Sequence, residues 1–155
     1  MRRLFYCDSV GTIGSVALLV LRLVVGLAFV FHGWPKIQSA TNWMGPPEVM
    51  PEMVQALVAF AEFGGGIALV LGLLTRLASI GIITVMIGAI VKVHLPKGDP
   101  FVNPGGSSYE LAAVYLACGI LFLVLGPGRL SLDAWLFGGI CVAEPGTVPP
   151  RTRDV

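Results

Sequence analysis

A single arginine interrupts the first long apolar stretch of the chain and constrains how that stretch can fold. The stretch covers about residues 13 to 31, reads IGSVALLVLRLVVGLAFVF and carries Arg22 near its middle. It has enough apolar residues to cross a bilayer as a helix. A charge at the middle of a bilayer costs roughly 3 kcal/mol or more. The rest of the chain must therefore supply Arg22 with a partner, a water-filled cavity or a function.

The composition is that of an integral membrane protein. Of the 155 residues, 55% are hydrophobic and 12% are charged, whereas a soluble domain carries about 25% charged residues. The net charge of +1 gives no broad electrostatic basis for binding nucleic acid, so membrane lipid is the expected surrounding and nucleic acid is not an expected partner. Arg2 and Arg3 precede the first stretch as in a signal peptide, but no small-residue cleavage pattern follows. The stretch is expected to be retained as a first span.

Four apolar stretches predict an all-α fold, an integral membrane four-helix transmembrane bundle. Each stretch is continuous over about 20 residues, whereas the strands of a membrane barrel alternate over about 10 residues. The predicted spans cover about residues 13–34, 52–74, 77–95 and 109–125.

The connections between the predicted spans differ in length. A polar, Pro-rich loop from Pro35 to Pro51 follows the first span, and Pro96 is expected to stop the third. Only Thr75 and Arg76 separate the second span from the third. These two spans are therefore expected to form a tight antiparallel hairpin.

Residues 1–137 are predicted to form one membrane domain, and residues 138–155 a disordered cytoplasmic tail rich in Gly, Pro, Thr and Arg. The segment just before this tail reads as a short interfacial element, in which Arg129 and Asp133 are expected to supply a salt bridge and a cap. The predicted spans place six arginines on one side of the membrane: Arg2, Arg3, Arg76, Arg129, Arg151 and Arg153. The positive-inside rule then puts both termini in the cytoplasm, the N-in/C-in orientation.

Polar side chains from all four predicted spans gather toward the outer half of the bundle when each helical residue rises 1.5 Å. They are His32, Lys36, Glu62, Lys92, His94 and Glu110. Arg22 and Glu62 lie deepest and follow stripes of small residues that mark inward faces. Because an unpaired buried charge is costly, these two are expected to pair or to share a ligand or water.

Lys92 and His94 are two residues apart, about 200° around an α-helix. Both can face one centre only if the helix loosens before Pro96.

Each polar residue also has a plainer interpretation. Arg22 with Glu62 could be a structural clamp, Lys36 could snorkel to headgroups, His94 could cap the loop, and His32 could be a satisfied helix-end histidine. A clamp alone needs neither both histidines nor Glu110, so the whole set favours a site.

Three segments resemble the signatures of the DoxX family. The run RLVVGLAFVFHGWPKI (22–37) has the family's Arg, Gly-Phe stretch and His-Gly-x-x-Lys ending. AEFGGGIALVLGLLTRLAS (61–79) is similar to its Glu-x-Gly-Gly…Gly-x-x-x-Arg second span. The YELA start at 109 and GPGRLSLDAWL (126–136) match its fourth span and tail. The resemblance covers about residues 16–137.

The resemblance implies a four-helix, multi-pass protein of the bacterial plasma (inner) membrane. Some family members are similar to subunits of a thiosulfate:quinone oxidoreductase. Others resemble partners of superoxide dismutase and a sulfurtransferase in a membrane-associated oxidoreductase complex. The leading expectation is therefore a redox-linked subunit of an oxidoreductase complex, with an outward-facing polar pocket for a quinone-like or small sulfur-oxyanion ligand. The resemblance leaves the cofactor open, with a quinone as one candidate. The sequence carries no haem, flavin or iron–sulfur motif, which argues against redox catalysis by this chain alone.

In this interpretation, positive charge for the ligand comes from Arg22, Lys36 and Lys92, and catalytic proton transfer from Glu62, His32, His94 and Glu110. The alternative is a non-enzymatic membrane scaffold that docks soluble redox enzymes through surfaces such as the Arg76 turn. A third interpretation, a transition-metal site made by the two histidines and two glutamates, uses acceptable ligands but lacks HxxxH or ExxH spacing.

Overall fold

The computed structural model describes residues 11–45 and 50–137, and within these ranges the chain is helical with no strand. The long helices are α1 (Thr12–Gln38), α2 (Glu52–Leu71), α3 (Thr75–Ala89) and α5 (Glu110–Leu125). Three short elements complete the set: the π-helical segment η2 (Ile90–His94), α4 (Leu95–Lys97) and α6 (Leu132–Phe137). The all-α prediction is confirmed. The predicted tail, residues 138–155, lies outside the described residues.

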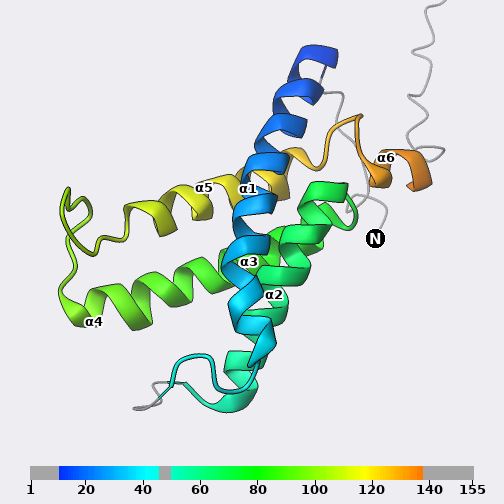
Figure 1. The fold of residues 1–155 in the computed structure, drawn as a ribbon. Coiled ribbons are helices and arrows are strands. Elements are labelled where there is room, and N and C mark those ends of the chain that lie inside the picture. Colours follow the sequence, from blue (N-terminus) through cyan, green and yellow to red (C-terminus); the bar gives the residue numbers. More distant parts are fainter. Residues whose placement is uncertain (1–10, 46–49, 138–155) are drawn as a thin grey trace, which may run out of the picture.

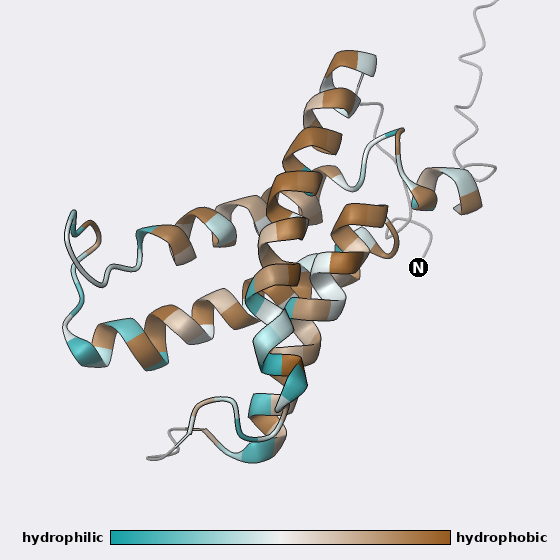
Figure 2. Cartoon of the chain, in the orientation of Figure 1, coloured by the Kyte–Doolittle hydropathy of each residue, from teal (hydrophilic) through white to brown (hydrophobic). Residues whose placement is uncertain are grey.

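Three helices of the described chain are long and apolar enough to cross a membrane: Thr12–Gln38, Glu52–Leu71 and Thr75–Lys97. Helix α5 is also apolar but has only 16 residues. Large apolar side chains face outward along these helices, and Val24, Phe60 and Val124 are each more than 60% exposed. Hydrophobic colour runs along the helices in Figure 2, and hydrophilic colour collects at their loop ends. Such an outward apolar surface suits lipid as the surrounding solvent.

The helices form two antiparallel pairs, α1 with α2 and α3 with α5 (Figure 1). Helices α2 and α3 diverge from the short turn at Gly72–Leu74 that joins them. Small residues bring α1 and α2 together, because an added Cβ at Gly66 would lie 2.7 Å from the Val30 nitrogen and one at Gly33 would lie 2.7 Å from the Phe63 Cα. The predicted stripes of small residues therefore face inward, as expected.

The turn between α2 and α3 is built by one glycine and one aspartate. Gly72 has a φ of +66°, which a glycine adopts at low cost, and the Leu73 N–H reaches back to the Ala68 carbonyl. Asp133 then accepts hydrogen bonds from the Leu74 N–H at 2.7 Å and the Thr75 N–H at 3.0 Å. The predicted cap at Asp133 is confirmed, and it acts on α3. The predicted salt bridge is not among the ion pairs of the described residues.

Two helix ends differ from prediction at prolines. Helix α1 continues through Pro35 to Gln38, because a proline in the last turn removes only one backbone donor. The third span likewise continues through Pro96 to Lys97. Just before Pro96, η2 widens the helix, and the Leu95 N–H bonds to the Ile90 carbonyl five residues back. The turn between α2 and α3 also lies earlier than expected, so Thr75 and Arg76 belong to α3. The expected tight hairpin of these two spans is wrong, because α2 and α3 diverge from their turn (Figure 1).

Arg22 joins α1 to the segment that follows α5. Its Nη1 donates to the Pro127 carbonyl at 2.6 Å and its Nη2 to the Leu130 carbonyl at 2.8 Å. The side chain is almost fully buried, with 1% exposed. The cost of burying this charge is therefore offset by charge-assisted hydrogen bonds to two backbone acceptors.

The expected pair between Arg22 and Glu62 is wrong. Gly26 packs against Val70 and Gly33 against Phe63, so Arg22 lies level with the end of α2, well past Glu62. Side chains on a helix also lean toward its N-terminus, which carries the guanidinium further toward the α2–α3 turn. The error came from placing the two residues at equal depth without knowing how the helices align.

Arg22→Leu should lower the free energy of unfolding in detergent by roughly 1–3 kcal/mol for each buried carbonyl left without a donor. The loss of unfolding free energy in Arg22→Lys should lie between that of wild type and that of Arg22→Leu, because an ammonium cannot span two acceptors as a guanidinium fork does. Arg129→Leu is the matched control, since that side chain is exposed on the same segment. Thermal unfolding of the Arg22→Leu protein at the wild-type midpoint would contradict this role.

Candidate functional site

A cavity of about 900 Å³ lies between α2 and α3, where the two helices diverge. Its walls are mainly apolar, with Val58 and Ala61 on α2 facing Val85 and Ala89 on α3. Side chains of the loop after α1, including Trp43, close one side. Four charged or titratable side chains also line it: Lys36, Glu62, Lys92 and His94.

Lys36 and Glu62 form a close ion pair at the wall of this cavity. The Lys36 Nζ lies 2.6 Å from each carboxylate oxygen of Glu62 and donates a hydrogen bond to Oε1. The Glu62 side chain is 5% exposed, whereas that of Lys36 is 24% exposed. The ammonium also lies 4.5 Å from the centre of the Trp43 ring, within cation–π range. Lys36 is therefore held in place by an anion and an aromatic face.

Gln55 fixes the loop that carries Trp43. This side chain is fully buried, accepts a hydrogen bond from the Met44 N–H and donates one to the Met50 carbonyl. Its backbone carbonyl accepts the Trp43 Nε1–H at 2.9 Å. Sequence reasoning missed both Gln55 and Trp43. The available signal was one amide side chain at the start of an otherwise apolar helix.

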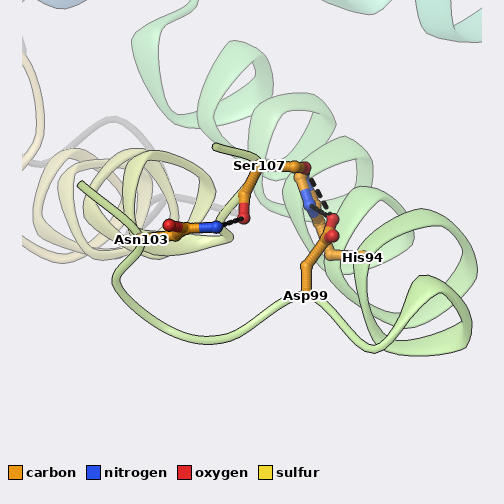
Figure 3. A network of polar contacts seen from close by, with 4 residues as sticks. All are labelled: His94, Asp99, Asn103 and Ser107. Carbon is orange, nitrogen blue, oxygen red and sulfur yellow. Dashed lines mark hydrogen bonds and ion pairs between the residues drawn. The ribbon is translucent and has the colours of Figure 1, made fainter. Parts of the chain in front are cut away.

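His94 lies at the η2 end of the cavity and is held by the loop that follows. Its Nδ1 is 2.8 Å from Asp99 Oδ2, and the Ser107 hydroxyl donates to the same oxygen at 2.7 Å (Figure 3). These two hydrogen bonds hold the pKa of Asp99 below its ordinary value, the Ser107 bond contributing most. These contacts agree with the plainer interpretation of His94, that it caps the loop.

Lys92 and His94 both line the same cavity, and η2 supplies the loosened helix that this arrangement was expected to need. Lys92 is exposed, and His94 is partly buried. Proline accounts for the loosening, because Pro96 has no N–H to give to the carbonyl four residues back. Short π-helical segments are frequent at functional sites.

Three of the predicted site residues lie elsewhere. Arg22 is bound to two backbone carbonyls of the segment after α5, and Glu110 is exposed in the first turn of α5. His32 is exposed on α1, with its ring edge-on to Tyr115 and the two ring centres 6.4 Å apart. Among the described residues no group of three or more His, Cys, Asp or Glu side chains is placed to hold a metal ion. The two histidines and two glutamates therefore do not form the metal site considered above.

The arrangement suits an amphipathic ligand. A volume of about 900 Å³ is within the ordinary range for ligand pockets, which are mostly apolar with a few placed polar groups. Lys36 offers a hydrogen-bond donor, and Glu62 and His94 are titratable groups that proton exchange requires. Because Glu62 already neutralises Lys36, the cavity has little free charge at that wall to attract a bare anion.

Lys36→Met should destabilise the folded protein by about 3–5 kcal/mol, since it leaves the buried Glu62 carboxylate without its cation. Adding Glu62→Leu should recover much of that loss, because the double variant buries no lone charge. Denaturation in detergent measures both, with Lys97→Met as an exposed-lysine control. Additive losses in the double variant would show that the two residues are not coupled.

Comparison with known proteins places the chain among bacterial membrane proteins. The DoxX family model matches residues 17–95. The uncharacterized membrane protein Rv3486 of Mycobacterium tuberculosis is 32% identical over 77% of this chain and 81% of its own length. CatD of Bacillus subtilis, named as a proposed oxidoreductase, is 29% identical over 81% of this chain and 90% of its own.

The inner membrane protein YqjF of Escherichia coli is 29% identical over 79% of this chain and 93% of its own length. No solved structure shows a significant match. The family model covers half of the chain, including Arg22, Lys36, Glu62, Lys92 and His94, and the relatives match along most of their lengths. The chain therefore belongs to the DoxX family.

Proposed function

We propose that this protein is a redox-linked component of an oxidoreductase complex, and that its cavity binds a quinone-like ligand. The observation that carries the proposal is the combination of a mainly apolar volume of about 900 Å³ with the Lys36–Glu62 pair on its wall. A quinone has the same division, a polar ring and an apolar tail. The name of one relative, a proposed oxidoreductase, adds support.

In this proposal Lys36 donates a hydrogen bond to an oxygen of the ring, and Glu62 and His94 exchange the protons that accompany electron transfer. Lys92 lies at the exposed rim and attracts polar substituents. A small sulfur oxyanion fits less well, because Glu62 neutralises Lys36 and most of the cavity wall is apolar. No role in the cavity is assigned to Arg22, His32 or Glu110.

Filling the cavity tests the proposal. Gly88 lines it, and nothing lies within 4 Å of a Cβ added there, so Gly88→Leu should fold while occupying ligand space. Gly64 has the same open surroundings but does not line the cavity, which makes Gly64→Leu the matched control.

A short-tailed benzoquinone should raise the melting temperature of wild type and Gly64→Leu, because a ligand that binds only the native state stabilises it. Gly88→Leu should lose that rise. Thiosulfate and sulfite form the oxyanion arm of the same screen. Absence of a shift with every ligand in well-folded wild type would favour the scaffold, whose signature is loss of co-purifying redox enzymes when the Arg76 region of α3 is altered.

The proposal also includes a multi-pass, four-span arrangement in the bacterial plasma membrane, with both termini in the cytoplasm. It rests on the arginine distribution, on the apolar helices, and on the E. coli relatives, which are named as inner membrane proteins. In this orientation the 98–109 loop faces outward.

A cysteine introduced at Asn103 should react with an impermeant thiol reagent added to intact cells, whereas native Cys141, which lies outside the described residues, should not. The chain without the introduced cysteine provides the background labelling. Labelling of Cys141 from outside would reverse the orientation.

A further inference from the structure

His94 has one ring nitrogen occupied and one free for the cavity. Nδ1 is bound to Asp99, and among the described residues no hydrogen bond is made to Nε2. His94 is one of the residues that line the cavity. Nε2 is therefore the atom through which His94 can meet a ligand.

The loop geometry makes Asp99 a fixed acceptor. Gly98 turns the chain with a φ of +72°, and the Asp99 N–H bonds back to the His94 carbonyl at 3.1 Å. This return brings the carboxylate beside the ring (Figure 3). Ser107 donates to the same oxygen that meets Nδ1, and Asn103 donates weakly to the Ser107 carbonyl at 3.4 Å.

The partner of Nδ1 decides which nitrogen carries the proton. An ionised carboxylate only accepts hydrogen bonds, so a neutral imidazole beside it must place its proton on Nδ1. The lowered pKa of Asp99 means that it is ionised at neutral pH. Nε2 is then a bare acceptor on a residue that lines the cavity.

We propose that Asp99 is a positioning residue that holds neutral His94 in the Nδ1–H tautomer, so that the cavity prefers the hydroxyl-bearing, quinol form of its ligand. This inference rests on the proposed function. A quinol can donate a hydroxyl hydrogen to Nε2 and accept from Lys36 through its oxygens. A quinone or a sulfur oxyanion offers only acceptors and leaves Nε2 without a partner in a mainly apolar cavity, which costs binding free energy.

The tautomer is measured without any ligand. In a His32→Gln background, His94 is the only histidine, and ¹⁵N chemical shifts of the labelled ring distinguish protonated from bare nitrogens. The expected result for the neutral ring is a protonated Nδ1 and a bare Nε2. Asp99→Asn, which preserves shape but can donate an N–H to Nδ1, should move the proton to Nε2.

Asn103→Ala is the control within the same loop and should keep the Nδ1–H form. A protonated Nε2 in the protein that retains Asp99 would overturn the inference. So would an unchanged Nδ1–H tautomer in Asp99→Asn, because the carboxylate would then not be the cause.

Ligand preference is measured by anaerobic titration with a short-tailed benzoquinol and the matching benzoquinone. Wild type should bind the quinol about tenfold more tightly than the quinone, because the quinone leaves one acceptor, Nε2, without a hydrogen-bond donor. Asp99→Asn should erase that preference. Equal affinity of wild type for the quinol and the quinone would overturn the inference and leave the proposed function standing. If neither the quinol nor the quinone binds, the proposed function and the ligand preference are both overturned. The tautomer result then still stands by itself.

Discussion

Among the residues that the structure describes, two charged side chains are buried between apolar helices, Arg22 and Glu62, and each is bound by a partner within the chain. Arg22 is bound by two backbone carbonyls near the α2–α3 turn, and Glu62 is bound by Lys36 toward the other end of α2. The first contact ties α1 to the segment after α5. The second ties α1 to α2 beside the cavity. Each offsets a desolvation cost that isolated charges in lipid would carry in full.

The cavity follows from how unevenly the helices pack. Glycines let α1 and α2 approach so closely that their backbones touch, whereas α2 and α3 are held together at their short turn and then diverge. Side chains cannot fill a widening angle between two helices to native density, so a space remains. The polar residues on its wall come from three separate elements, α1, α2 and η2. These residues come together only in the folded protein, because no single segment of the sequence carries them all.

Much of the fold could be predicted because periodicity and continuous apolar length are local signals. The helices, the inward stripes and the grouping of Lys36, Glu62, Lys92 and His94 all follow from residue spacing and from the rise of a helix. The ion-pair partners could not be predicted, because they depend on how far α1 is shifted along α2. That alignment is set by contacts such as Gly26 against Val70, and α1 also runs past the proline expected to end it.

The polar contacts made by residues in or near loops could not be predicted either. Gln55, Trp43 and Asp99 carry polar contacts of the cavity, yet polar residues near loops are too common for any one of them to stand out in a sequence. The role of Asp133 could be predicted from the sequence, because an aspartate at the start of a short helix is typical of a cap. Its action on a different helix, α3, still depends on the tertiary fold.

The wide turn at η2 is equivalent to one surplus residue in the helix. A uniform α-helix advances by about 100° per residue, so everything after the wide turn is rotated by about that much relative to an unbroken helix. If the same residues were wound as an even α-helix, Leu95 and the chain beyond it would lie about a quarter of a turn further around the helix axis. The loop carrying Asp99 would then start from a different azimuth. The direction from which Asp99 meets the His94 ring is thus set by the winding of the helix at η2, and this local winding is as much a part of the site as side-chain identity.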